Sequence, residues 1–436
     1  MTLHHIVPQL RERIATSIWF IPLVLCAICL ASGLALSWAD NNLSPPQWFF
    51  QQASIPVTAA RQVLATIAGA LLGIGGVVFS VTMVALTLTS GQYGPKLLRQ
   101  YLSDSHAKIS MGLFIGTSLY CLLAMSSYRV AETPGYTLSG ALLLTLLSLI
   151  AFIAFIHNTA TDLQADQIIQ RLGRDLSQAL HDLATPERPE RRSRDTAAWR
   201  RRARGQSRCS IGSAQSGYVQ AIDYQGILEW CVDRDYCVLL RVRAGDFLLQ
   251  GSCVAAVFGR AADANADDLL EFQQRFISTG PVRTPIQDPE YPITQLNQLI
   301  NRALSPGIND PGTAITCIDW YSKALSEIID SDLPGTVFVD AQSTPRIMAR
   351  LSDLRGLVRA FYAPVRQCSR ENVPVLVNLL ESLERLAAVT RRPDRLALIA
   401  EEGDCLLDTI NRDQYVAHDQ RTLNHRYRKL QRTCNR

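Results

Sequence analysis

Two acidic residues in matching short sequences are the first candidates for chemistry in this chain of 436 residues. Asp288 lies in "IQDPEYPIT" and Asp310 in "INDPGTAIT", and each aspartate stands between an amide residue and a proline. This arrangement is typical of a helix start, where the carboxylate caps free backbone amides and proline occupies the first helical position. The sequence therefore predicts that two consecutive helices begin with the same cap.

The two aspartates could also have roles other than capping, because three polar residues lie near them in the sequence, namely Arg283, Arg302 and Asn309. The five residues could close a polar network between helices, or they could bind a small ligand or partner. Phosphate is disfavoured, because each capping carboxylate occupies the helix amides and repels an anion. An enzyme with Asp288 and Asp310 as paired carboxylates is a third interpretation, which requires the two groups to lie within about 10 Å of each other.

The segment "RALSPGINDPG" between the two caps predicts a sharp break in the helical pattern. The first helix is expected to end near Leu304, because Pro306 disfavours helical geometry in the residue before it. Pro306 and Gly307 suit the central positions of a type II turn, with a positive φ at the glycine.

Signatures of common catalytic and metal sites are absent from the sequence. It contains no G-x-x-x-x-G-K-[ST], H-E-x-x-H or G-x-S-x-G motif, and its 7 histidines show no metal-binding spacing. Its 11 cysteines include no C-x-x-C pair and are expected to be free thiols. We predict no metal and no cofactor and find no positive argument for an enzyme. A net charge of +4 is too small and too scattered to indicate nucleic-acid binding.

The elements that carry these residues follow an apolar block over residues 1–160. Four apolar runs, at 18–38, 63–90, 109–127 and 137–157, reach the roughly 20 residues that a transmembrane helix needs. A signal peptide is the alternative for the first run, but its apolar core exceeds the roughly 7–15 residues of a signal. The sequence therefore predicts four transmembrane helices.

Basic residues in the short loops predict the orientation of these helices. Arg11 and Arg13 precede the first run, and Lys96, Arg99 and Lys108 lie between the second and third. Lysine and arginine in short loops stay on the cytoplasmic side. We therefore expect a bacterial inner-membrane protein with both termini in the cytoplasm, in contact with the lipid bilayer.

The second run carries small residues, namely Gly69, Gly73, Gly75, Gly76 and Ser80. Small residues on one face of a membrane helix let another helix backbone approach closely. Two interpretations compete. The glycines form a packing seam within one four-helix bundle, or the helix lines a pore at the axis of a homo-oligomer.

The remaining chain is predicted to form three further parts. Residues 161–208 suggest an amphipathic stalk and an arginine-rich linker, which is either a solvated loop or a contact for anionic lipid. Residues 209–260 contain four short strand patterns and a turn "AGD", typical of a small β module, and "GTVFVD" indicates one further strand. The rest of 261–436 is mainly helical, with leucine stripes typical of a helical bundle.

Several stretches together resemble a family of predicted bacterial membrane proteins known as a domain of unknown function. They are "RQVLATIAGALLGIGGVVFSVTMVALTLTSGQYGPKLLRQYL", "GYVQAID", "AGDFLLQG" and above all "RALSPGINDPGTA". The resemblance covers nearly the whole chain and implies a four-span inner-membrane protein with a cytoplasmic domain. It implies no activity and no catalytic residues. The predicted fold class is a mainly α membrane protein, with four transmembrane helices followed by a cytoplasmic α+β domain.

Two functional hypotheses follow from the sequence. The first is an oligomeric, channel-like protein whose second apolar helix lies near the symmetry axis and whose cytoplasmic domain regulates passage of an ion or small solute. The alternative is a membrane-anchored scaffold or sensor that binds a partner or small ligand at the corner formed by residues 283–314.

Overall fold

The computed structural model describes residues 19–42, 56–93, 105–127, 136–162, 165–184, 192–259, 272–412 and 415–436. The chain divides into two compact units, 1–167 and 168–436, which we describe separately. Of the basic residues that predicted the orientation, Arg11, Arg13, Lys96 and Arg99 lie outside the described residues.

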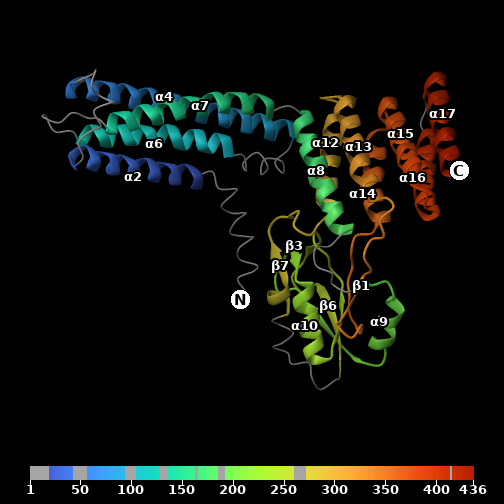
Figure 1. Ribbon diagram of the computed structural model, residues 1–436. Helices are drawn as coiled ribbons and strands as arrows, with labels where there is room; N and C mark the ends of the chain where they lie inside the picture. The colour runs from blue at the N-terminus through green and yellow to red at the C-terminus, as the bar shows by residue number, and fades with distance from the viewer. Residues whose placement is uncertain are drawn as a thin grey trace. The chain divides into compact units, whose positions relative to one another are not determined.

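The described residues of the first unit contain four helices that are each long and apolar enough to cross a membrane. This confirms the four predicted apolar helices. Helix α4 has 37 residues, which corresponds to about 55 Å and exceeds the roughly 30 Å hydrocarbon core. The four helices are α2 (Phe20–Asn42), α4 (Val57–Tyr93), α6 (Ser105–Ser127) and α7 (Tyr136–Asp162) (Figure 1).

Helix α6 is the centre of this unit and packs against α2, α4 and α7. Its apolar window is 56% buried, whereas those of the other three helices are 17–22% buried. The absence of a side chain at Gly112 and Gly116 lets α2 approach, since a Cβ at Gly116 would lie 2.9 Å from the sulfur of Cys29. Gly140 of α7 allows a similar approach, since a Cβ there would lie 2.6 Å from Leu36 of α2.

The second unit contains two β-sheets, a larger mixed sheet and a smaller antiparallel sheet (Figure 1). The larger sheet has six strands in the order β1-β8-β9-β4-β6-β2, and the smaller has the order β5-β3-β7. Among the described strands, only β4 and β9 pair in parallel. The strands are β1 (Arg192–Ser193), β2 (Ser207–Gly212), β3 (Gly217–Ile222), β4 (Cys237–Leu240), β5 (Phe247–Leu248), β6 (Cys253–Gly259), β7 (Ile277–Gly280), β8 (Val337–Val339) and β9 (Pro345–Met348).

Two short helices cover opposite faces of the larger sheet. Trp199 of α9 (Thr196–Ala203) packs on one face beside Cys237 and Val337. Trp230 of α10 (Tyr224–Arg234) belongs to the larger core on the other face. Alternating side chains of the same strands supply both cores, as expected for a sheet buried on its two faces.

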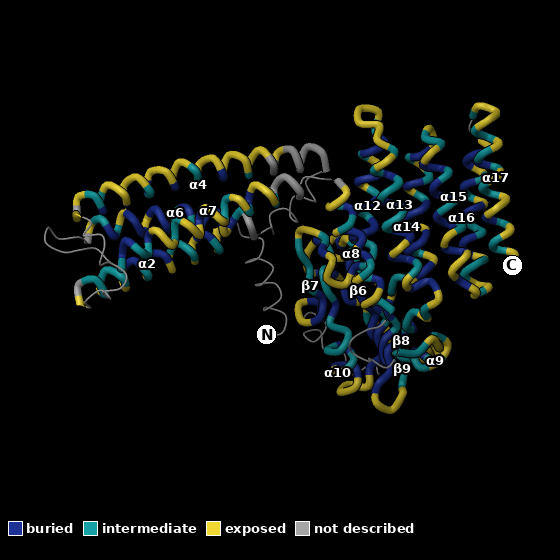
Figure 2. The backbone as a smooth tube through the Cα atoms, turned by 45° about the horizontal axis from the view of Figure 1, so that its top comes forward, coloured by how far each residue is buried: buried dark blue, intermediate teal, exposed yellow. Residues whose placement is uncertain are grey.

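Seven helices lie side by side beyond the sheets, and their facing sides are buried (Figures 1 and 2). Asp353 and Asp310 cap α14 and α13 through the amides of Gly356 and Thr313. The helices are α8 (Ala165–Ala184), α12 (Glu290–Ala303), α13 (Pro311–Ser326), α14 (Leu354–Cys368), α15 (Val373–Val389), α16 (Pro393–Arg412) and α17 (Ala417–Cys434).

Helix α8 packs into this bundle along α13. Its apolar stripe, which includes Ile169 and Leu176, is fully buried. The ring of Trp320 fills the space left by Gly173, and Lys323 donates a hydrogen bond to the Ser177 hydroxyl at 3.2 Å. The helix that the sequence suggested as a stalk is thus largely part of the second unit.

The fold class predicted from the sequence is confirmed, because apolar helices are followed by a unit with small sheets and a helical bundle. The β module is larger than the expected range 209–260, since strands β1, β7, β8 and β9 come from outside that range. Part of the arginine-rich linker is also ordered as β1 and α9, where Arg202 pairs with Asp235. All 11 cysteines are free thiols.

Candidate functional site

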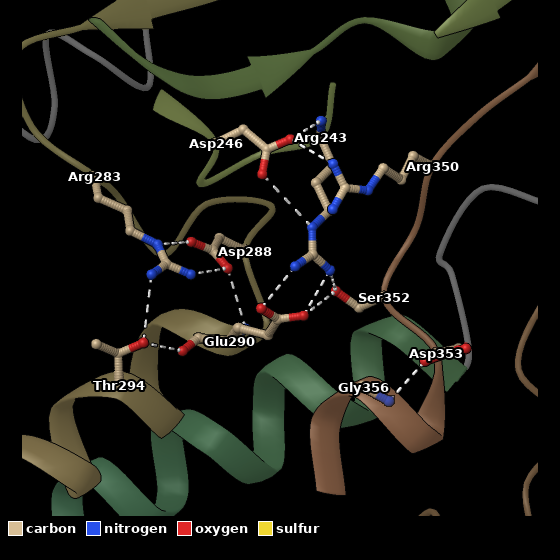
Figure 3. A network of polar contacts seen from close by, with 10 residues as sticks. All are labelled: Arg243, Asp246, Arg283, Asp288, Glu290, Thr294, Arg350, Ser352, Asp353 and Gly356. Carbon is tan, nitrogen blue, oxygen red and sulfur yellow. Dashed lines mark hydrogen bonds and ion pairs between the residues drawn. The ribbon is translucent and has the colours of Figure 1, made fainter. Parts of the chain in front are cut away.

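Three connecting segments meet where the sheets join the helical bundle, and they form a network of ion pairs (Figure 3). The turn before β5 contributes Arg243, and the segment between β7 and α12 contributes Arg283 and Asp288. The segment between β9 and α14 contributes Ser352. We call this set, with Glu290 at the start of α12, the sheet–bundle network.

Arg283 and Asp288 form the most buried ion pair of the network. The guanidinium Nε contacts one carboxylate oxygen, and Nη2 donates to the other at 2.9 Å. The Asp288 side chain is only 3% exposed, whereas that of Arg283 is 26% exposed. Burial lowers the pKa of Arg283, but the hydrogen bonds and charge of Asp288 outweigh it and raise this pKa overall. Arg283 therefore stays charged and holds Asp288 in place.

Gly245 lets the turn before β5 approach this pair. Its φ is +91°, in the region where residues with a side chain are strained. A Cβ at this position would lie 2.8 Å from Cγ of Asp288 and 2.9 Å from Nε of Arg283. Glycine is therefore required here both by backbone conformation and by contact.

Arg243 forms a second, bidentate ion pair with Glu290. Its Nη1 and Nη2 donate to the two carboxylate oxygens at 2.6 and 2.8 Å. Ser352 joins them, accepting from Arg243 at 2.8 Å and donating to Glu290 at 3.1 Å. Asp246 accepts from the Arg243 amide at 3.1 Å and lies 3.5 Å from Arg350. Bidentate pairs fix orientation as well as position.

The charges of the sheet–bundle network are matched within it. Arg243, Arg283 and Arg350 face Asp246, Asp288 and Glu290, and every one of these side chains has an ion-pair partner. Such an arrangement links three segments rigidly and gives an incoming ligand charge few open partners. No cluster of three or more metal-binding side chains occurs among the described residues.

The other predicted residues lie at the far end of α12. The helix ends at Ala303 with Leu304 as C-cap, as predicted. Asp310 caps α13 by accepting from the Thr313 amide at 3.1 Å, also as predicted. The expected type II turn is wrong, because the positive φ belongs to Asn309 (+48°) and not to Gly307. The Ser305 carbonyl accepts the amides of Ile308 and Asn309, so residues 305–309 form a turn of their own that follows the helix and has its positive φ at the asparagine.

Asp288 and Asp310 do not share a cap geometry and do not meet. Asp310 reaches the amide three residues ahead, whereas Asp288 accepts from Glu290 at 3.1 Å and is held by Arg283. The Asp310 amide donates to Ala303 in the last turn of α12, about 20 Å along the helix from Glu290. This separation removes the paired-carboxylate interpretation, which required about 10 Å.

Arg302 lies in the last turn of α12, near Asp310 rather than Asp288. Its Nε is buried and has no hydrogen-bond partner among the described residues. The predicted corner of residues 283–314 is therefore two separate places, with Arg283 and Asp288 at one end of α12 and Arg302, Asn309 and Asp310 at the other.

The glycines of α4 point in two directions. Gly75 is buried, and a Cβ there would lie 3.6 Å from Phe114 of α6. Gly69, Gly73, Gly76 and Ser80 are exposed, and a Cβ at any of the three glycines would meet no atom within 4 Å. These exposed residues follow each other at intervals of four, three and four, so they form one stripe, which we call the α4 outer stripe.

Comparison with known proteins agrees with this architecture. Residues 15–385 match the family described as "Predicted membrane protein (DUF2254)". The chain belongs to the DUF2254 family. This confirms the resemblance found in the sequence. The DUF2254 match includes both ends of α12 and all four apolar helices. Helices α16 and α17 lie beyond it.

Relatives of this DUF2254 chain include three mycobacterial proteins. "Uncharacterized protein MT1328" and "Uncharacterized protein Rv1290c" of Mycobacterium tuberculosis are each 26% identical over 390 residues. "Uncharacterized protein Mb1321c" of Mycobacterium bovis shows the same identity over the same length. Each alignment covers 87% of this chain and 73% of the relative. No solved structure gives a significant match.

Sequence reasoning missed Arg243, Glu290 and Ser352. Glu290 was within the quoted repeat, directly after Asp288 and Pro289, but nothing local marks it as the partner of an arginine 47 residues earlier. The turn "AGD" was recognised as a break between strands, and its glycine and aspartate turn out to contact the network. The available signal was the pair Gly245 and Asp246, which follows Arg243 closely in the turn between two strands.

Proposed function

We propose that this protein is a multi-pass inner-membrane protein that self-associates through the α4 outer stripe, with the second unit in the cytoplasm. The observation that carries the proposal is the open space at Gly69, Gly73 and Gly76, whose Cβ positions meet no atom within 4 Å. Glycine costs about 1 kcal/mol relative to alanine in a helix. In membranes such residues allow close helix–helix approach, so the stripe fits the backbone of another copy.

The cytoplasmic placement of the second unit rests on the basic residues of the short loops. Arg11, Arg13, Lys96 and Arg99 flank the first three apolar helices on what would be one side, whereas Lys108 lies in the first turn of α6 and is 5% exposed. The free state of all 11 cysteines is compatible with a reducing compartment.

A solute pathway along the symmetry axis is the functional extension of this proposal. Thr66 and Ser80 lie on or beside the α4 outer stripe and would bring hydroxyl groups to the axis. Thr66 also donates to the Gln62 carbonyl at 2.8 Å. Within one copy α6 packs against the other three helices and its apolar window is 56% buried, so conduction would require several copies.

The test combines assembly with conductance. Gly73→Ile with Gly76→Ile should convert the purified oligomer to smaller species, as measured by native mass spectrometry or subunit-counting photobleaching. Ala70→Ile is the matched control, because Ala70 is also exposed but lies about 100° around the helix from Gly69.

Planar bilayers then separate assembly from conduction. Conductance that falls in the glycine variants and not in the Ala70 variant supports a pathway. If the oligomer forms but shows no conductance in bilayers, the α4 outer stripe is an assembly surface only. A monomeric wild-type particle refutes the proposal.

The alternative of a ligand-binding scaffold at residues 283–314 has less support. Asp288 is occupied by Arg283, and Asp310 by the amide and hydroxyl of Thr313. Lipid contact by the arginine-rich linker also has less support. Part of that linker is folded into the second unit as β1 and α9, where Arg202 pairs with Asp235.

A further inference from the structure

The start of α8 stays close to the bilayer surface, whatever the angle between the two units. The membrane-crossing part of α7 ends at Asn158, the helix continues to Asp162, and α8 begins at Ala165. Four helical residues rise about 6 Å, and three Cα steps add at most about 11 Å. The first residue of α8 therefore lies within about 17 Å of the hydrocarbon edge.

Helix α13 begins at the same end of the bundle as α8. Gly173 faces Trp320, and Ser177 accepts from Lys323, so the two helices run parallel. Counting back from these contacts brings Ala165 level with the first turn of α13, each about 12–14 Å from the Gly173–Trp320 contact. The segment before α13, residues 304–310, therefore lies at the same end of the bundle as the start of α8.

Two other connections reach the same end. Helices α12 and α14 both begin at the sheet–bundle network and run together, as the hydrogen bond from Asn297 to the Ala360 carbonyl shows. The connection after α14, residues 369–372, thus lies beside residues 304–310. Tyr415 donates to the Arg370 carbonyl at 2.7 Å, which brings residues 415–417 to the same place. We call these three segments the loop end.

The loop end presents large apolar side chains to the outside. Ile308 is 50% exposed and Val416 is 72% exposed, each at the tip of a connection between helices. Ile308 is held outward by a well-bonded turn, because Ser305 accepts the amides of both Ile308 and Asn309. Arg302 and Arg412, in the last turns of α12 and α16, supply positive charge beside these tips.

We infer that the loop end rests on the bilayer, with Ile308 and Val416 inserted at the headgroup level. Apolar side chains flanked by basic residues suit this interface, where the side chain leaves water and the guanidinium meets lipid phosphate. The short connection from α7 argues for lipid as the occupant, because it limits the start of α8, at the same end of the bundle, to about 17 Å from the hydrocarbon edge. A second copy of the chain is the competing occupant.

The test uses the full chain in bacterial membranes with p-benzoylphenylalanine replacing Ile308, Val416 or Val389. Val389 is the matched control, since it is 56% exposed but ends α15 at the opposite end of the bundle. After irradiation, mass spectrometry should find phospholipid adducts at positions 308 and 416 several-fold above those at 389. Equal adduct levels at all three positions, or chain–chain adducts at 308 and 416, would overturn the inference.

A second measurement does not depend on the photoreactive group. In lipid nanodiscs, amide hydrogen exchange over residues 304–310 should be slower than in detergent micelles, and Ile308→Asp should abolish that difference. Ile308 is 50% exposed, so this variant should keep its α12 and α13 protection. Identical exchange of the wild-type segment in nanodiscs and micelles would also overturn the inference.

Discussion

Gly245→Ala should destabilise the second unit by crowding the most buried ion pair of the sheet–bundle network. The glycine has φ +91°, and its Cβ position lies 2.9 Å from Nε of Arg283 and 2.8 Å from Cγ of Asp288. Gly251→Ala is the matched control, because Gly251 has φ +82° but no atom within 4 Å of its Cβ position. Both variants carry the backbone strain, and only one disturbs the pair.

The two variants should differ by about 2 kcal/mol. A left-handed conformation costs a residue with a side chain about 1–2 kcal/mol, and this applies to both. Breaking a buried ion pair costs about 3–5 kcal/mol. Because 26% of the Arg283 side chain is exposed and can be rehydrated, we expect roughly half of that cost, about 2 kcal/mol. For a unit of this size, the difference corresponds to about 4–8 °C in Tm.

Thermal unfolding of the full chain in one detergent, followed by tryptophan fluorescence, measures this difference. A double-mutant cycle, in which both glycine substitutions are repeated in an Asp288→Ala variant, is the decisive comparison. Without the carboxylate, Arg283 loses its partner and its side chain can move away from the Cβ at position 245. Gly245→Ala and Gly251→Ala should then lower Tm equally. Equal effects already in the wild-type background would refute the reasoning, because crowding of the pair would contribute nothing.

Two further predictions concern the helical bundle. Gly173→Ala should loosen α8, because its Cβ would lie 2.6 Å from the Trp320 ring, and faster hydrogen exchange confined to α8 would report this. Asp310→Ala should cost about 0.5–2 kcal/mol of stability as a lost cap, measured by denaturant unfolding. The hydrogen bond from the Thr313 hydroxyl, then that from its amide, lowers the pKa of Asp310. The stabilisation is therefore present above the ordinary carboxyl pKa and lost as pH falls through the lower folded value, and Asp310→Ala should abolish this part of the pH dependence.

The apolar helices could be predicted from the sequence because length and composition alone specify them. Nothing else in the chain offers runs of about 20 apolar residues. The strands at 217–222 and 253–259 were also predictable, since they show apolar runs bounded by turn residues. By contrast, β1 has 2 residues and β9 has 4, too few for a period, and β9 joins the sheet by pairing with β4 more than a hundred residues earlier.

The direction of the α4 glycines could not be predicted, although their presence could. Small residues indicate close approach of some helix, but spacing along one helix does not say whether the neighbour belongs to the same copy. The structure separates the cases, because Gly75 faces Phe114 whereas Gly69, Gly73 and Gly76 face outward. Within the bundle, the close approach comes instead from Gly112 and Gly116 of α6 and from Gly140 of α7.

The repeated Ile-amide-Asp-Pro sequence shows why local similarity did not predict a shared role. Asp310 lies in an exposed connection, where the nearest donors are the amide and hydroxyl of Thr313, so it becomes a cap. Asp288 is buried beneath the sheets, where an unpaired carboxylate would be costly, and Arg283 five residues earlier supplies the charge that burial demands. The environment, and not the four-residue pattern, thus decides the partner. Arg283→Gln should accordingly destabilise the protein far more than Asp310→Ala. The first change removes the ion-pair partner of Asp288, and the second removes the capping carboxylate itself.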